Sequence, residues 1–180
     1  MIKKMLFLAI VLTLVVSSKA QIWSTTTGKV SFFSKTPLED IDGTNIKVMS
    51  VLNSKREMAI IILNTGFDFP NKLMQEHFNE KYLESDKFPN STFKGKINEE
   101  IDLTKEGEYK VTVTGKLNIH GVEMDRTITG TIKVKGGNIQ MISTFKVRND
   151  DHNIKIPTIV ASKIAEELDV NVDLTLAPKK

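Results

Sequence analysis

The chain has 180 residues, of which 40% are hydrophobic and 26% charged, and it contains no cysteine. This composition is typical of a globular protein, while the missing cysteines exclude disulfides, thiol catalysis and cysteine metal sites. Of the 25 basic residues, three lysines fall within residues 1–20, which leaves 22 basic against 22 acidic residues in the rest of the chain. Balanced charge argues against a nucleic-acid partner, because nucleic-acid binding normally needs a basic surface.

Residues 1–20 have the three parts of a secretory signal peptide. A basic start is followed by an apolar run from Met5 to Val16 and by a small-residue cleavage site that ends at Ala20. The apolar run is too short for a membrane-spanning helix, which needs about 20 apolar residues. Gln21, rather than Cys, follows the expected cut, which excludes a lipoprotein anchor at that position. We therefore predict a periplasmic or secreted protein whose mature part, residues 21–180, is one domain without a stable membrane span.

The first half of the mature part is predicted to mix strands with one helix. Strands are expected at residues 23–33 and at residues 57–63, the latter a continuous apolar run that predicts burial on both faces. Residues 46–52 fit either a strand or one helical turn. The period changes in the segment Asn71–Leu83, where apolar residues recur every three or four positions, as in a helix that its first residue can cap. A strand returns at residues 92–103.

The stretch from Gly107 to Val147 has the clearest pattern, because apolar and polar residues alternate in three successive runs. Side chains of a strand point alternately to its two faces, so each run predicts a strand with one buried and one solvated face. Glycines at position 121 and at positions 136 and 137 mark tight turns between the runs. Three strands joined in this way form an antiparallel meander, which is typical of a sandwich or a barrel.

Residues 158–165 are predicted to form a short helix, and residues 169–176 a closing strand with strict alternation. The chain is thus expected to be mainly β, with about eight strands and one or two short helices in a single domain. A barrel of that size can be filled by its own side chains or can enclose one ligand. The residue pattern leaves both outcomes open.

Three histidines, His77, His120 and His152, are the candidates for chemistry. No two of them have the close spacing of a metal site, so no metal is predicted. The chain also contains no nucleophile elbow and no phosphate-binding glycine loop, so catalytic residues and a cofactor are not predicted either. Two alternatives stay open: a small-molecule enzyme that uses His77 or His120 as acid or base, and a ligand-free secreted domain with a structural or stress-related role.

Three segments together resemble the YceI-like family of bacterial exported proteins. They are LMQEHFNEKYLESDKFPNSTFKGKI, YKVTVTGKLNIHGVEMDRTITGTI and TFKVRNDDHNIKIP. The features that carry the resemblance, by their order and spacing, are His77-Phe78, Phe88-Pro89 with Phe93, His120-Gly121-Val122, and Phe145 before Asp151 and Ile154. The resemblance covers roughly residues 28–176. It implies a lipocalin-like antiparallel barrel that encloses a long apolar chain, typically a polyisoprenoid lipid, and an exported location.

The strand periods and the resemblance together select an apolar lining for such a lipid. The candidate lining residues are Phe32, Phe67, Phe69, Leu73, Met74, Phe78, Phe93, Ile97, Val111, Val113, Leu117, Ile119, Ile132, Met141 and Phe145. Burial of an isoprenoid chain is favourable by about 25 cal/mol per Å² of apolar surface, so binding needs no catalytic group. We predict an exported, non-catalytic protein that binds an apolar isoprenoid-type lipid, and leave open whether it forms a homodimer.

Overall fold

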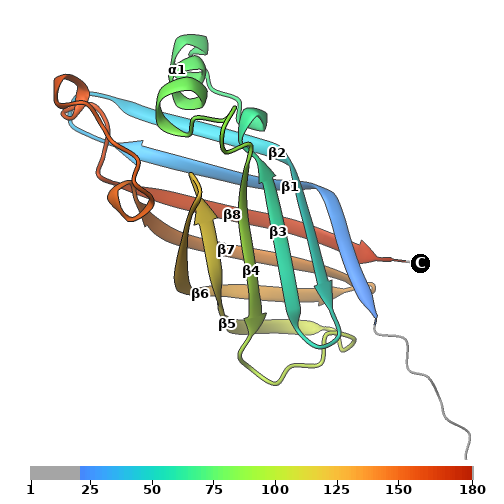
Figure 1. Ribbon diagram of the computed structural model, residues 1–180. Helices are drawn as coiled ribbons and strands as arrows, with labels where there is room; N and C mark the ends of the chain where they lie inside the picture. The colour runs from blue at the N-terminus through green and yellow to red at the C-terminus, as the bar shows by residue number, and fades with distance from the viewer. Residues whose placement is uncertain (1–20, 180) are drawn as a thin grey trace, which may run out of the picture.

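The computed structural model describes residues 21–179, and the predicted signal peptide, residues 1–20, lies outside them. Eight antiparallel strands form one closed barrel in chain order (Figure 1). The strands are β1 (Ile22–Lys35), β2 (Asp40–Asn53), β3 (Glu57–Leu63), β4 (Asn90–Ile97), β5 (Gly107–Ile119), β6 (Val122–Lys135), β7 (Asn138–Arg148) and β8 (Glu167–Pro178). The predicted mainly β barrel is therefore confirmed.

The helical segments lie in the connections. They are α1 (Lys72–His77), the π-helical turn η2 (Phe78–Tyr82), and the 3-10 turns η1 (Asn64–Gly66), η3 (Asp150–His152) and η4 (Thr158–Val160). The predicted cap of α1 is present, because the Asn71 side chain accepts a hydrogen bond from the Leu73 N–H at 2.9 Å. Within residues 21–179, no helix is both long enough and apolar enough to span a membrane.

Three predictions about the strands and helices are wrong in detail. Strand β3 is buried on one face only: Ile60 is 8% exposed, whereas its neighbour Ile61 is 39% exposed and lies on an apolar outer surface opposite Met49 of β2. Strand β4 ends at Ile97, because the Asn98 side chain bonds to threonine hydroxyls of β5 and residues 98–106 leave the sheet. Residues 46–52, for which the sequence left a strand or one helical turn open, belong to the long strand β2. This outcome settles an open alternative and is not one of the three errors.

The third error concerns residues 158–165, which form only the short turn η4 instead of the expected helix. Hydrogen bonds from the end of this segment explain the difference. The Ala165 N–H donates to Ser34 Oγ at 2.9 Å, and the Ala165 carbonyl accepts from Asn149 Nδ2 at 2.9 Å. These contacts hold the segment against β1 and the end of β7, where a continued helix could not satisfy them.

Part of the hydrophobic core lies where β2 and β4 end, at the end of the barrel away from α1 in Figure 1. Leu52, Ile97, Ile139 and Leu176 are fully buried there. Trp23 packs with them, and its indole N–H donates to the Gly137 carbonyl in the β6–β7 turn at 2.9 Å. This end is therefore closed by packed side chains.

Candidate functional site: a two-part apolar cavity

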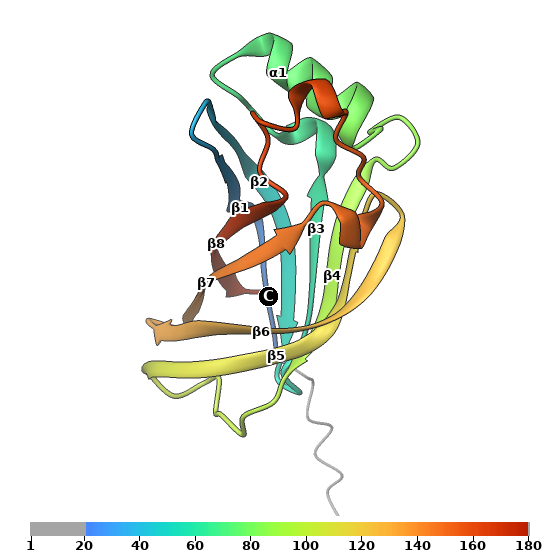
Figure 2. The same cartoon turned by 90° about the vertical axis from the view of Figure 1, so that its left-hand side faces the viewer.

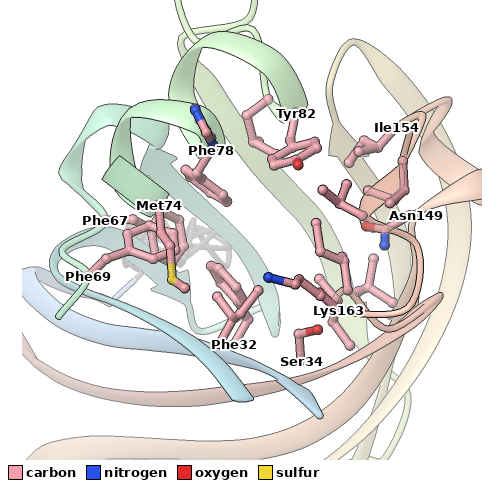
Figure 3. Close-up of a pocket in the computed structure, with 18 of the residues that line it drawn as sticks. Phe32, Ser34, Phe67, Phe69, Met74, Phe78, Tyr82, Asn149, Ile154 and Lys163 are labelled. Atoms are coloured by element: carbon pink, nitrogen blue, oxygen red, sulfur yellow. The ribbon is translucent and has the colours of Figure 1, made fainter. Parts of the chain in front are cut away.

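An outer cavity of about 390 Å³ lies under α1, between the helix and the segment that connects β7 to β8 (Figure 3). Its walls come from β1, from the loop between β3 and α1, from α1 and η2, and from residues 147–170. Leu73 is largely exposed at its edge, and Lys163 stands at the same cavity with its side chain half exposed. We call this exposed end of the cavity the mouth. Its volume lies within the range of small-molecule binding sites.

An inner cavity of about 120 Å³ continues the outer one into the middle of the barrel. Ser91, Ile119, Val147 and Val170 line both cavities, so the two spaces adjoin. The inner walls are almost entirely apolar and come from β3 to β8. The barrel is thus hollow from the mouth to its middle and filled beyond, so it has internal space that its own side chains do not fill.

Four phenylalanines form the wall of the outer cavity beside α1. Phe32 of β1 stacks on Phe78 of η2, with ring centroids 5.4 Å apart and planes 15° apart. Phe67 and Phe69, from the loop before α1, pack against both rings at centroid distances between 5.0 and 5.6 Å. Gly43 of β2 makes room for this cluster, because a Cβ there would lie 2.6 Å from the Phe32 ring. The apolar contacts of the cluster hold the helix over the barrel, together with the backbone bridge between Thr44 and Asp68.

The structure brings fourteen of the fifteen candidate lining residues to the walls of these cavities. Phe32, Phe67, Phe69, Leu73, Met74 and Phe78 line the outer cavity, Phe93, Val111, Val113, Leu117, Ile132, Met141 and Phe145 line the inner one, and Ile119 lines both. Ile97 lines neither, because it is fully buried in the filled end of the barrel. Contact of these residues with a lipid stays a prediction.

Several lining residues were not among the candidates. Val170, Val172 and Leu174 of β8 face the cavities, and the strict alternation of that strand already contained the signal. The segment from Ile154 to Ile164 also lines the mouth, but it has no regular period from which its position could have been predicted. Its place depends on the hydrogen bonds of Ala165 described above.

Polar groups gather at the outer cavity. Lys163 Nζ lies 3.8 Å from Glu39 Oε2, so the two opposite charges at the mouth balance each other. Ser34 and Asn149 also line this cavity and are buried. Since the Ser34 oxygen accepts the Ala165 N–H, its own O–H is left to donate. The inner cavity has no charged lining residue, so the site has a polar outer end and an apolar inner end.

The histidines are divided between the cavity and the scaffold. His77 lines the outer cavity, whereas His120 lines neither cavity. His120 Nε2 lies 2.9 Å from Glu84 Oε2 and its Nδ1 lies 3.1 Å from the His152 carbonyl oxygen. These two contacts tie the β5–β6 turn to the segments beside it. Within residues 21–179, no cluster of three or more His, Cys, Asp or Glu side chains is arranged to hold a metal ion.

His152 gives the scaffold a pH dependence that can be measured. The side chain is fully buried, and this burial lowers the pKa of its imidazole below the ordinary value of about 6.5. The unfolded chain therefore binds a proton before the folded one does, and stability falls as the pH drops below about 6.5, by at most about 1.4 kcal/mol per pH unit. Urea unfolding between pH 7.5 and 5 should show this loss, and His152→Gln should flatten it. Parallel curves for the two proteins would rule out His152 as the source.

Comparisons with known proteins agree with this architecture. The family model of the YceI-like domain matches residues 13–176. The barrel is similar to a polyisoprenoid-binding domain from Saccharophagus degradans, with a TM-score of 0.77 and 14% identity over 89% of this chain and 100% of that one. It is also similar to BcnA of Burkholderia cenocepacia, with a TM-score of 0.71 and 19% identity over 83% of this chain and 96% of that one.

A third similar structure is the YCEI protein of Campylobacter jejuni, with a TM-score of 0.55 and 20% identity over 99% of this chain and 91% of that one. A search of curated proteins found no match. At these identities the solved structures establish the fold, while the family model covers most of the sequence, including the helix, the meander and the closing strand. The chain belongs to the YceI-like domain family.

Proposed function

We propose that this protein is an exported, non-catalytic binding protein that holds one apolar isoprenoid-type lipid inside its barrel. The observation that carries the proposal is the pair of adjoining cavities, whose apolar walls extend from the mouth to the middle of the barrel. A chain buried there gains about 25 cal/mol for each Å² of apolar surface removed from water. The polyisoprenoid-binding description of the Saccharophagus degradans domain supports the same ligand class.

The distribution of histidines favours binding over catalysis. His120 is occupied by two hydrogen bonds within the scaffold, and only His77 faces the outer cavity. An acid–base enzyme would need a side chain that can exchange a proton with a bound substrate. Replacing His77 and His120 by Gln is therefore expected to leave lipid binding within about twofold of the wild type in a folded protein. A turnover that these replacements abolish would favour the enzyme alternative.

The polar outer end of the site favours a lipid with an uncharged polar head group. We place the head group at the mouth, where Lys163 is paired with Glu39, and the apolar tail in the inner cavity. Because the pair is neutral as a whole, a phosphate there would repel Glu39 as much as it attracts Lys163. The buried Ser34 hydroxyl can donate to an alcohol or carbonyl oxygen of the head group.

Removing Glu39 tests this placement. Glu39→Gln should strengthen binding of geranylgeranyl phosphate by about threefold, because it frees the partly exposed Lys163, and should leave geranylgeraniol binding unchanged. Fluorescence titration with the two ligands measures both effects. Glu123→Gln, which removes an equal charge from a Lys116 pair on the outer surface, is the matched control. Equal changes in both variants, or a wild type that prefers the phosphate, would contradict the placement.

Export and self-association are separate parts of the proposal. Export predicts that the protein in the cell envelope begins at Gln21, which N-terminal sequencing can check. Homodimer formation stays a prediction. The outward faces of β2 and β3 carry the exposed apolar residues Met49, Val51, Ile61 and Leu63, so a pairing through this surface should be weakened by Ile61→Lys. Sedimentation of the wild type and of Ile61→Lys over a range of concentrations would detect the dimer and its weakening.

A further inference from the structure

Strands β6 and β7 are joined by backbone pairing along only part of their length. The paired residues extend from the turn as far as Thr131 and Ile142 and stop there. On their other sides, β6 stays paired with β5 as far as Val122, and β7 stays paired with β8 as far as Arg148. Figure 2 shows β6 and β7 diverging from their shared hairpin. We call the two facing unpaired edges, residues 122–130 and 143–148, the seam.

Side chains, rather than a backbone ladder, connect the two edges of the seam. Ser143 Oγ donates to the Thr129 carbonyl at 2.6 Å. Arg126 Nη2 donates to the Lys146 carbonyl at 2.6 Å, and Arg126 Nη1 lies 3.7 Å from a carboxylate oxygen of Asp151. Two side-chain bonds thus join the two edges of the seam, and Asp151 and His152 of η3 contact the β6 edge beyond the end of β7. In the described residues no backbone pair crosses the seam.

The inner cavity lies directly behind the seam. Ile128 and Gly130 line it from the β6 edge, and Ser143 and Phe145 line it from the β7 edge. Inward-facing residues of β6 are 2–3% exposed where the ladder is formed, at Ile132 and Val134, but Ile128 and Gly130 at the seam are only half buried. The apolar interior is therefore less covered along the seam than beside the paired part of β6.

A second gap in the ladders shows that incomplete pairing alone does not leave the interior uncovered. Strands β2 and β3 pair only from Met49 to Leu52 of β2. That gap is covered by the backbone bridge between Thr44 and Asp68 and by the buried rings of Phe67 and Phe69. In the described residues no backbone bridge crosses the seam. The buried ring of His152 lies at its Val122 end, with Nδ1 3.1 Å from the Val122 carbonyl oxygen, whereas Ile128 and Gly130 are only half buried.

We propose that the seam is a lateral portal through which the hydrocarbon chain of the lipid passes into the inner cavity. This inference rests on the proposed function. The ligand class is a single long apolar chain with a polar head group, because such a chain can enter sideways while its head group stays at the mouth. Val147 of the seam lines both cavities, so the seam borders the outer cavity as well as the inner one. Opening the portal breaks a few side-chain contacts and leaves every backbone ladder intact.

Loosening the seam is the first test. Arg126→Gln removes the bond to Lys146 and the ion pair with Asp151, and should speed uptake of a fluorescent geranylgeraniol analogue from phosphatidylcholine vesicles by about tenfold. The amount bound at equilibrium should stay within about twofold of the wild type. Lys133→Gln is the matched control, because it removes a cation from the same strand within its paired part.

Locking the seam with a disulfide is the second test. Because the chain contains no cysteine, two introduced cysteines have no native thiol with which to pair. A Cβ built at Gly130 lies 3.4 Å from Ser143 Cβ, close to the Cβ separation of disulfides. The Gly130→Cys/Ser143→Cys pair should therefore slow uptake at least about tenfold when oxidised and regain the rate when reduced. Gly130→Ala controls for crowding, because the same Cβ lies 2.8 Å from the Ile142 carbonyl oxygen.

The two tests separate failure of the portal from failure of the proposed function. A wild type that takes up no lipid at all contradicts the proposed function. If the wild type binds lipid but the Arg126→Gln protein loads at the wild-type rate, the portal is contradicted and the proposed function is not. Equal rates for the oxidised and reduced cysteine pair also contradict the portal. Faster loading in Arg126→Gln with unchanged loading in Lys133→Gln supports the portal even if the disulfide does not form.

Discussion

Val113→Asp is expected to abolish lipid uptake. Val113 faces the inner cavity from β5, among apolar side chains of the neighbouring strands. A carboxylate there would have to lose its hydration when a hydrocarbon chain fills the cavity, which costs several kcal/mol. Binding should therefore weaken at least about 100-fold at pH 7. Because burial raises the pKa of a carboxyl group, part of the affinity should return at acidic pH. Fluorescence titration with a geranylgeraniol analogue measures both effects.

A charge on the outer face of the barrel is the control for Val113→Asp. Thr127 of β6 faces outward, and its hydroxyl lies 3.2 Å from that of Thr114 on β5. Thr127→Asp should bind lipid within about twofold of the wild type, because the added carboxylate stays in water. Circular dichroism would establish that both variants are folded. A folded Val113→Asp protein that still binds with the wild-type affinity would remove Val113 from the lipid site.

Gly115→Ala is expected to cause the largest loss of stability. Gly115 of β5 lies opposite Gly95 of β4, and the two strands approach so closely that a Cβ at Gly115 would lie 2.2 Å from the Lys94 carbonyl oxygen. That atom is part of the backbone, so the strands would have to separate to accept a methyl group. We expect the free energy of unfolding to fall by about 3 kcal/mol, at the upper end of the cost of overpacking. Urea unfolding measures the change.

Gly136 provides the comparison for Gly115. It has φ of +58° in the β6–β7 turn, and a Cβ there would meet no atom within 4 Å. Gly136→Asn should change the free energy of unfolding by less than about 1 kcal/mol, because Asn tolerates this left-handed conformation. An equal loss of stability in Gly115→Ala and Gly136→Asn would show that glycine flexibility, rather than close strand approach, governs both positions.

Local periodicity was sufficient to predict most of the barrel. The alternation in Gly107–Val147 predicted which side chains face inward, because strand geometry fixes that choice residue by residue. The same rule failed for residues 57–63, where an outer surface that is itself apolar made a half-exposed strand look fully buried. The prediction that Ile97 lines the cavity was wrong for another reason. The strand period shows that its side chain points inward, but it does not show which part of the barrel interior is filled by side chains.

The mouth was less predictable than the walls. Lys163 and Glu39 are far apart in the sequence, and the hydrogen bond from the Ala165 N–H to Ser34 helps to hold the segment before β8 against β1. The seam was not predicted either, although the inward positions of β6 and β7 hold Arg126, Gly130 and Ser143 where their pairing ends. Pairing depends on how two strands diverge in space, and the alternation within a single strand does not show it.

Native mass spectrometry of the protein purified from its own cell envelope tests the central claim most directly. If the cavities hold an isoprenoid-type lipid, the spectrum should show a species heavier than the polypeptide beginning at Gln21, and organic extraction should recover a lipid that accounts for the added mass. The adjoining outer and inner cavities give the space for one such molecule. A single mass equal to that of the polypeptide, with no extractable lipid, would contradict the claim.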